Sequence, residues 1–133
     1  MGGETDLTRL LSSLSPKLHD GEYVFCSFKD AHYGDYMELQ PLAIFAESEG
    51  LTLIIPKNRA DEYRVVYDAV FRCITLAVHS GLAVVGFTAA VSSKLAAHGI
   101  AANVVAAYHH DHIFIPFECA ARAVQVLGEF NRR

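Results

Sequence analysis

The sequence predicts an α+β fold, and three consecutive patterns in its second half predict it. Residues 71–78 mix β-branched and aromatic side chains, which favours a strand. Apolar residues then recur at spacings of three and four, which predicts a helix over residues 82–98, and Gly99 supplies the left-handed turn that ends it. Residues 100–108 and 113–116 are extended again, with a short polar run between them. The predicted order is strand, helix, strand, strand.

The other segments continue this alternation. Before residue 71 we expect a short leucine-rich helix ended by Ser15 and Pro16, a strand at 22–28, an irregular polar loop at 29–40, a hairpin of strands at 41–47 and 51–56, and a short helix at 60–68. After residue 116, apolar residues at helical spacing predict an amphipathic helix over residues 118–130. Such a helix is expected to cover one face of a sheet.

The chain matches itself when it is shifted by 60 residues. Ile55 and Pro56 fall on Ile115 and Pro116, and further matches are Ala46 with Ala106, Ala60 with Ala120 and Val66 with Val126. Chance similarity between two hairpins is the alternative explanation. We prefer an internal duplication, with an N-terminal arm and a degenerate first repeat over residues 1–70 and a second repeat over residues 71–133.

Length, charge and cysteine content exclude several classes of function. A chain of 133 residues and 14.6 kDa forms one domain, or two small ones that share a core, and can fold without disulfides. The net charge of -4 and the lack of a large basic cluster argue against a nucleic-acid partner. Three widely spaced cysteines in apolar runs indicate a reduced, cytoplasmic location. No signal peptide or spanning segment is visible, so we expect no membrane partner.

Several short motifs together resemble the ACT domain family. They are the strand and loop Val78-His79-Ser80-Gly81, the helix entry Val84-Val85-Gly86, the turn at Gly99-Ile100 with Asn103-Val104 behind it, and the turn with Asp111 that leads into residues 113–115. The likeness covers about residues 10–127. It extends to small stand-alone proteins of uncharacterised function with two ACT repeats, and to the tandem ACT repeats of amino-acid sensors and aspartate kinases.

The resemblance implies a ferredoxin-like βαββαβ fold, with an antiparallel sheet that carries helices on one face. The sequence departs from that pattern in two places. No clear helix follows residue 28 in the first repeat, and no strand follows residue 130 in the second. One repeat must therefore take its missing strand from the other half of the chain or from a partner chain.

The resemblance also implies a small effector, usually an amino acid, bound between repeats or between subunits. The residue chemistry is consistent with this, because a loop that ends in Gly81 and enters a helix presents N–H groups to a carboxylate. Gly86 allows close approach, Asn103 offers a donor and an acceptor, and Asp111 can take an ammonium group. The expected contacts are Val78, His79, Ser80, Gly81, Val84, Val85, Gly86, Asn103, Val104 and Asp111, with Glu49 of the first repeat as a weaker candidate.

Each of these residues also has a purely structural explanation. Asn103 could simply satisfy backbone groups at the edge of a sheet. Gly81 and Gly86 could belong to an ordinary turn from a strand into a helix, and Glu49 could lie in a solvated hairpin. None of these glycines forms a nucleotide-binding pattern.

A metal site and a catalytic site are both weighed against simpler explanations. His109, His110 and His112 with Asp111 resemble a metal-binding set, but alternation sends His109 to the opposite face from the other two histidines. Polar residues are also common in hairpin connections, so we expect no metal there. No GxSxG motif occurs, and no other complete catalytic set is recognisable. We therefore expect no catalytic activity and no cofactor.

The sequence thus predicts a non-catalytic regulatory or sensor protein that binds a small amino acid or a related metabolite. The helix around residues 82–91 is apolar on nearly all sides, which predicts a homodimer or a higher homo-oligomer. Two competing hypotheses remain. One is a constitutive protein-interaction module with no effector, and the other, less favoured, is a metal-dependent enzyme that uses the turn from His109 to His112.

Overall fold

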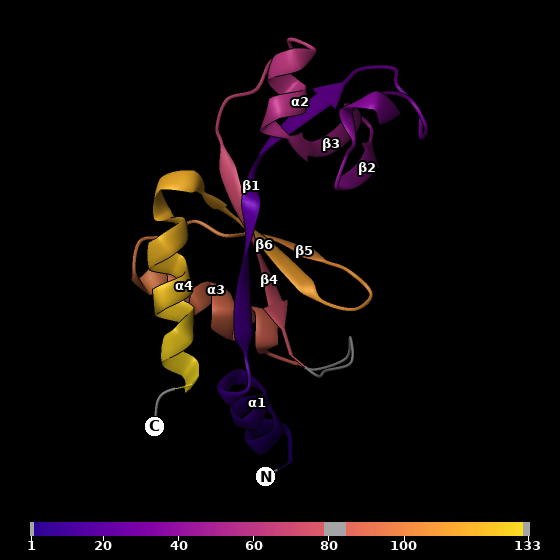
Figure 1. Ribbon diagram of the computed structural model, residues 1–133. Coiled ribbons are helices and arrows are strands. Elements are labelled where there is room, and N and C mark those ends of the chain that lie inside the picture. Colours follow the sequence, from indigo (N-terminus) through magenta and orange to yellow (C-terminus); the bar gives the residue numbers. More distant parts are fainter. Residues whose placement is uncertain (1, 79–84, 132–133) are drawn as a thin grey trace. The chain divides into compact units, whose positions relative to one another are not determined.

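The computed structural model describes residues 2–78 and 85–131 of the chain (Figure 1). The elements in chain order are α1 (Gly2–Ser12), β1 (Ser15–Phe28), the 3-10 helix η1 (Met37–Leu39), β2 (Ala43–Glu47), β3 (Gly50–Pro56), α2 (Lys57–Glu62), β4 (Phe71–Ala77), α3 (Phe87–Ala97), β5 (Asn103–Ala106), β6 (Asp111–Pro116), η2 (Phe117–Cys119), α4 (Ala120–Gly128) and η3 (Glu129–Asn131). The predicted α+β class is confirmed. Among the described residues, no helix is long and apolar enough to cross a membrane.

The chain divides into two compact units, each described by itself. The inserted unit is Asp20–Phe71, and the terminal unit is Met1–His19 together with Arg72–Arg133. The hydrogen-bonded strand order is β2-β3-β1-β4-β6-β5, in which β1 contributes its first residues to the terminal unit and its last residues to the inserted unit. The strand missing from the second repeat in the sequence is therefore the beginning of β1.

The inserted unit is an antiparallel sheet of β2, β3 and the second part of β1, with α2 and η1 packed on it. Side chains alternate along β3, so that Leu51, Leu53 and Ile55 point to the same face. They form a core with other buried apolar side chains, which are Val24, Cys26, Leu39 and Ala60. Burial of these side chains provides the main driving force for folding of this unit.

The terminal unit carries its helices on one face of the sheet. Ile74 and Leu76 of β4 point to that face, where α3 contributes Phe87, Val91 and Leu95 and α4 contributes Ala123, Val126 and Leu127. Helix α1 adds Leu10, and Leu14 just after it is also buried. Lys94 of α3 pairs with Glu129 after α4 at 3.0 Å, which ties the outer surfaces of the two helices together. The opposite face of β4 carries Cys73 and Thr75 instead.

The internal repeat reappears in the strand register. In the β2–β3 hairpin Ala43 pairs with Ile54, and in the β5–β6 hairpin Asn103 pairs with Phe114. The next three pairs of the two hairpins also differ by 60 residues on both strands. Because a hairpin's register is set by its turn and its apolar pattern, this agreement is difficult to obtain by chance. A helix follows each hairpin, namely α2 and α4.

Among the element boundaries that differ from the sequence-based expectation, three have a clear physical reason. Helix α2 starts at Lys57 and ends at Glu62, whereas 60–68 was expected, because Arg64 has a left-handed φ of 58° that no helix can continue through. Helix α3 begins only at Phe87, since Gly86 has a φ of 92°. Strand β1 begins at Ser15 and not at residue 22, because pairing with neighbouring strands overrides the low strand propensity of residues 15–21.

Gly50 begins β3 where the neighbouring strand comes very close. A Cβ atom at this position would lie 2.8 Å from Ser27 Oγ and 3.1 Å from the backbone oxygen of Phe28. The Ser27 side chain can rotate away, but the Phe28 carbonyl is fixed by the sheet. We therefore expect Gly50→Ala to lower the free energy of unfolding by about 1–3 kcal/mol in urea denaturation.

Gly21 in β1 gives a matched control for this substitution. A Cβ there would lie no closer than 3.4 Å to the Tyr23 side chain, which is ordinary contact. Gly21→Ala is expected to change the free energy of unfolding by about 0.5 kcal/mol or less. Equal effects of Gly21→Ala and Gly50→Ala would contradict the assigned close approach at Gly50.

Candidate functional site

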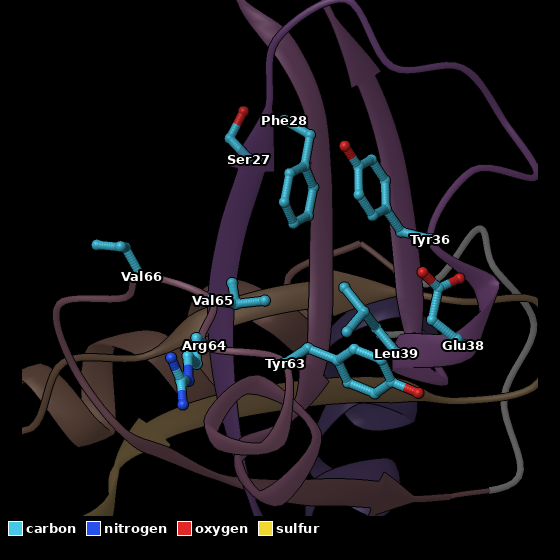
Figure 2. Close-up of a pocket in the computed structure, with 9 residues that line it drawn as sticks. All are labelled: Ser27, Phe28, Tyr36, Glu38, Leu39, Tyr63, Arg64, Val65 and Val66. Carbon is cyan, nitrogen blue, oxygen red and sulfur yellow. The ribbon is translucent and has the colours of Figure 1, made fainter.

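The inserted unit contains a groove of about 440 Å³ (Figure 2). Its lining comes from the end of β1, from η1 with the residue before it, and from the segment after α2; the residues are Ser27, Phe28, Tyr36, Glu38, Leu39, Tyr63, Arg64, Val65 and Val66. The volume lies within the usual range of small-molecule sites. The groove is open to solvent, since most of its lining side chains are exposed.

Unusual backbone conformations build the wall that contains η1. Tyr36 before this 3-10 helix and Gln40 after it have left-handed φ values of 64° and 54°. These two residues reverse the chain on either side of a single helical turn. The turn directs Leu39 into the core, where it is 1 % exposed, while Glu38 stays at the surface. Tyr36 stacks on Phe28 with ring centroids 3.9 Å apart and an interplanar angle of 14°.

The opposite wall follows the end of α2. The N–H of Val65 donates to the carbonyl of Ala60 at 2.8 Å, and Arg64 adopts its left-handed φ just before this bond. Figure 2 shows Glu38 and Arg64 on opposite sides of the groove, with Leu39 and Tyr63 between them. The site therefore combines an aromatic and aliphatic lining with one negative and one positive side chain at its margins.

Sequence reasoning missed this groove. The segment 29–40 was predicted only as an irregular polar loop that bears aromatic residues, and 60–68 as a helix. The groove depends on three left-handed residues, Tyr36, Gln40 and Arg64, none of which is glycine. Their side chains give little sign of this conformation, since non-glycine residues seldom adopt it. The only available signal was the cluster of aromatic and charged residues in the loop.

The loop site expected from the sequence is described only in part. His79, Ser80, Gly81 and Val84 lie outside the described residues. Val78 directly follows β4 and packs against the core of the terminal unit, while Val85 is 89 % exposed. Gly86 is the residue before α3, and a Cβ there would lie 3.2 Å from Leu7 Cδ2. Helix α1 thus approaches the beginning of α3, a contact that sequence patterns do not reveal.

Asn103, Val104 and Asp111 all lie in the β5–β6 hairpin, but not at one point. Asn103 is exposed, not buried, and its side-chain amide donates to the carbonyl of Phe114 at 3.2 Å. Asp111 is the first residue of β6, opposite Ala106, so it lies in a strand and not in the turn. Three residue steps of about 3.3 Å each separate the pair at Asn103 from the pair at Asp111. The two polar groups therefore lie about 10 Å apart along the hairpin.

Glu49 lies in the turn between β2 and β3, in the other unit. Its side chain is exposed, and its Oε1 accepts a hydrogen bond from the Ser48 hydroxyl at 3.0 Å. This geometry is that of a solvated hairpin turn. Glu49 is not among the residues that line the groove.

A second polar cluster lies in the terminal unit on the sheet face opposite the helices. His19 Nε2 lies 2.6 Å from Thr75 Oγ1, which in turn lies 2.9 Å from His112 Nδ1. Cys73 occupies the same face of β4, two residues before Thr75, and is fully buried. Burial raises the pKa of the Cys73 thiol to about 11. Burial, followed by the nearby His19 and His110, lowers the pKa of His112, so this imidazole is neutral at pH 7.

The histidines of the predicted turn therefore do not lie together in the structure. His109 and His110 are exposed in the connection between β5 and β6, where the N–H of Ala107 donates to the carbonyl of His110 at 3.0 Å. His112 lies within β6 and faces His19 and Thr75 from other strands. Sequence spacing could not reveal this grouping, because its members come from three separate strands.

Comparison with known proteins assigns the family of both halves. Two models described as ACT domain match the chain, one over residues 2–72 and the other over residues 69–129. No protein of curated function matches the sequence. Together the two matches cover nearly the whole chain and overlap at the start of β4.

Solved structures resemble the chain along most of its length. A protein of unknown function from Vibrio cholerae, VC0802, described as a possible transport protein, is 48 % identical with a TM-score of 0.91, and the match covers 98 % of this chain and 100 % of that one. Protein Atu0741 from Agobacterium tumefaciens is 15 % identical, with a TM-score of 0.69 and 89 % coverage of both chains. The regulatory subunit of aspartate kinase from Thermus thermophilus, in a ligand-free form, is 10 % identical, with a TM-score of 0.62 and coverage of 88 % and 97 %.

The two low-identity structures show a shared fold alone, whereas the family models also match the sequence itself. Their boundaries place one match on the half with the β2–β3 hairpin and the other on the half with the β5–β6 hairpin. This agrees with the register that repeats after 60 residues. Such domains support a regulatory, ligand-binding role. The chain belongs to the ACT domain family and contains two ACT domains in tandem.

Proposed function

We propose that this protein is a non-catalytic regulator that binds a small amino acid in the groove of the inserted unit. One observation carries the proposal. The groove places a carboxylate, Glu38, and a guanidinium, Arg64, on opposite sides of an aromatic and aliphatic lining. An amino acid at neutral pH has the complementary pair of charges, an ammonium and a carboxylate, on one carbon atom.

The lining also indicates what kind of side chain the ligand carries. Arg64 can form a bidentate pair with a carboxylate, and Glu38 can accept hydrogen bonds from an ammonium group. The faces of Tyr36 and Tyr63 add an attraction for a cation. Leu39, Val65 and Phe28 offer only apolar surface. We therefore expect an amino acid with an apolar or aromatic side chain to bind better than a charged one.

The expected affinity is modest. Charge-assisted hydrogen bonds contribute roughly 1.5–3 kcal/mol each, and immobilising a small ligand offsets part of this. Because Glu38 and Arg64 are exposed, solvent weakens both contacts further. A dissociation constant between about 1 mM and 1 μM follows. Such a value suits a sensor that responds to changes in metabolite concentration.

The loop before α3 remains a second proposed site for the same class of ligand. Its support is the family resemblance of Val78 to Gly81 and of Val84 to Gly86, together with the helix N-terminus that follows. Asn103, Val104 and Asp111 of the same unit stay with that hypothesis as proposed contacts. The two sites are lined by different residues, so single substitutions distinguish them.

A thermal-shift screen of the twenty amino acids tests the proposal. A ligand that binds only the folded state at a hundredfold excess over its dissociation constant adds about 2.7 kcal/mol, which raises the melting temperature by several degrees. We expect Glu38→Gln and Arg64→Gln to abolish the shift. Asn103→Ala, in the other unit, and Glu49→Gln, an exposed acid in the same unit, are expected to keep it.

The reverse pattern decides for the other site. A shift that survives Glu38→Gln and Arg64→Gln but disappears in Asn103→Ala assigns the ligand to the loop before α3. If none of the twenty amino acids raises the melting temperature, amino-acid binding is contradicted. That result would then favour the protein-interaction module, which the exposed apolar side chains Met37, Leu42 and Phe45 also support.

We further propose that the protein is a homodimer or a higher homo-oligomer. ACT domains often associate, and α3 uses only Phe87, Val91 and Leu95 for its own core. Its other side carries small residues such as Ala89 and Ala96, which are exposed and permit close packing of another chain. A light-scattering mass equal to that of one chain, 14.6 kDa, would refute this proposal.

A further inference from the structure

The hydrogen-bonded cluster on the sheet of the terminal unit contains the donor atoms of a transition-metal site. Candidate donors of His19, Cys73 and His112 all lie within 4.8 Å of one another. Each comes from a different strand, β1, β4 and β6, which are neighbours in the sheet. We propose that these three side chains bind a zinc ion. This inference is independent of the amino-acid groove, which lies in the other unit.

The choice of metal follows from the donors. Two imidazole nitrogens and one thiolate sulfur suit Zn²⁺, whereas Ca²⁺ and Mg²⁺ require oxygen ligands. A tetrahedral zinc ion with bonds of about 2.0–2.3 Å holds its donors roughly 3.3–3.6 Å apart. The present donor-to-donor spacing of up to 4.8 Å therefore has to shrink by about 1.2–1.5 Å, within the reach of side-chain rotation. Three protein ligands leave the fourth position for water or another small ligand.

The surroundings hold these donors in place before a metal binds. Thr75 Oγ1 contacts both histidine rings, at 2.6 Å and 2.9 Å, and is itself only 8 % exposed. The backbone oxygen of His19 accepts a hydrogen bond from Arg72 Nη2 at 2.7 Å, which fixes that strand position. In known sites, a hydrogen bond to the ring nitrogen that does not bind the metal orients the histidine. Cys73 and Thr75 share one face of β4 because they are two residues apart.

The competing explanation is a polar network that needs no metal. In it the Thr75 hydroxyl donates to one imidazole and accepts from the other, and Cys73 is an ordinary buried thiol. The network accounts for Thr75 and the two histidines. It does not require a cysteine, whereas the proposed three-ligand site does, so the role of Cys73 separates the two explanations.

The test is titration of the reduced, chelator-treated full-length protein with Zn²⁺ or Co²⁺ alone. We expect one equivalent of metal to bind per chain, and Co²⁺ to produce the near-ultraviolet charge-transfer band of a cobalt thiolate. Cys73→Ser is expected to abolish that band. His19→Gln and His112→Gln are each expected to weaken binding at least tenfold.

Two matched controls separate this cluster from other cysteines and histidines. Cys26→Ser changes a buried thiol in the inserted unit, and His110→Gln changes an exposed histidine two residues before His112. Both are expected to leave the stoichiometry and the cobalt band unchanged. If circular dichroism shows that Cys73→Ser does not fold, metal binding by His112→Gln is the deciding measurement. The His112 side chain is only partly buried, so this variant is expected to fold.

Three results would overturn the inference. The first is less than one equivalent of bound zinc at micromolar concentrations. The second is a cobalt spectrum without the thiolate band. The third is metal binding that depends on His110 and persists in Cys73→Ser, which would move the site to the exposed turn.

Discussion

Replacing Leu39 with alanine is expected to lower the free energy of unfolding by about 2–5 kcal/mol, the range found when a large buried side chain is truncated. Leu39 is 1 % exposed and belongs to the core of the inserted unit. It also lines the groove between Glu38 and Tyr63. The substitution therefore removes core contacts and part of the proposed ligand surface together.

The loss is expected near the upper part of that range because η1 can hardly collapse into the cavity. The turn is held by hydrogen bonds from Leu39 N to Tyr36 O and from Gln40 N to Met37 O, both at 3.0 Å. Tyr36 and Gln40 are already in left-handed conformations, so further movement meets steric limits. Urea denaturation followed by circular dichroism measures the change.

Met37 gives the matched control in the same helical turn. Its side chain is 53 % exposed, so Met37→Ala removes little buried surface. We expect a change within about 0.5 kcal/mol. If Met37→Ala and Leu39→Ala destabilise equally, the two residues share the same environment, and η1 does not direct Leu39 into the core as described.

The sequence predicted the structure best in the two hairpins, where the pattern of apolar residues is consistent with the strand register. The β2–β3 hairpin was expected at residues 41–47 and 51–56 and lies at Ala43–Glu47 and Gly50–Pro56. The shift of 60 residues anticipated the β5–β6 hairpin with its identical register. Each residue in such a hairpin pairs with a near neighbour, so local patterns determine the outcome.

The sequence was least informative where residues far apart meet. His19 and His112 contact the same threonine although they are 93 positions apart in the sequence. The chain supplied a more obvious candidate, the run from His109 to His112, whose members the structure sends in different directions. Only strand order determines which side chains become neighbours across a sheet, and strand order is not a local property.

The groove was hidden for a different reason. Its walls depend on left-handed conformations at Tyr36, Gln40 and Arg64, which are fixed by the surrounding structure and not by the residues' own preference. Strained backbone of this kind collects at ligand sites, because it is retained only where the rest of the fold compensates for it. This places the groove, and not the more regular β5–β6 hairpin, first among the proposed ligand sites.

Replacing Leu127 with alanine is the second substitution with a large expected effect. Leu127 lies in α4, is fully buried, and packs in the core of the terminal unit with residues of α3 and β4. Removing its side chain leaves a cavity between two helices and a sheet, whose hydrogen bonds resist collapse. We expect a loss of about 2–5 kcal/mol in the free energy of unfolding, measured by urea denaturation.

Gln125 tests whether this loss comes from burial or from the helix itself. It lies two residues before Leu127 in α4, with its side chain exposed, and alanine is an excellent helix former. Gln125→Ala is therefore expected to be neutral or slightly stabilising. The difference in the free energy of unfolding between Leu127→Ala and Gln125→Ala should persist when the amino-acid ligand is added, since the groove lies in the other unit. A Leu127→Ala protein that is as stable as Gln125→Ala would mean that α4 does not pack on the sheet through this face.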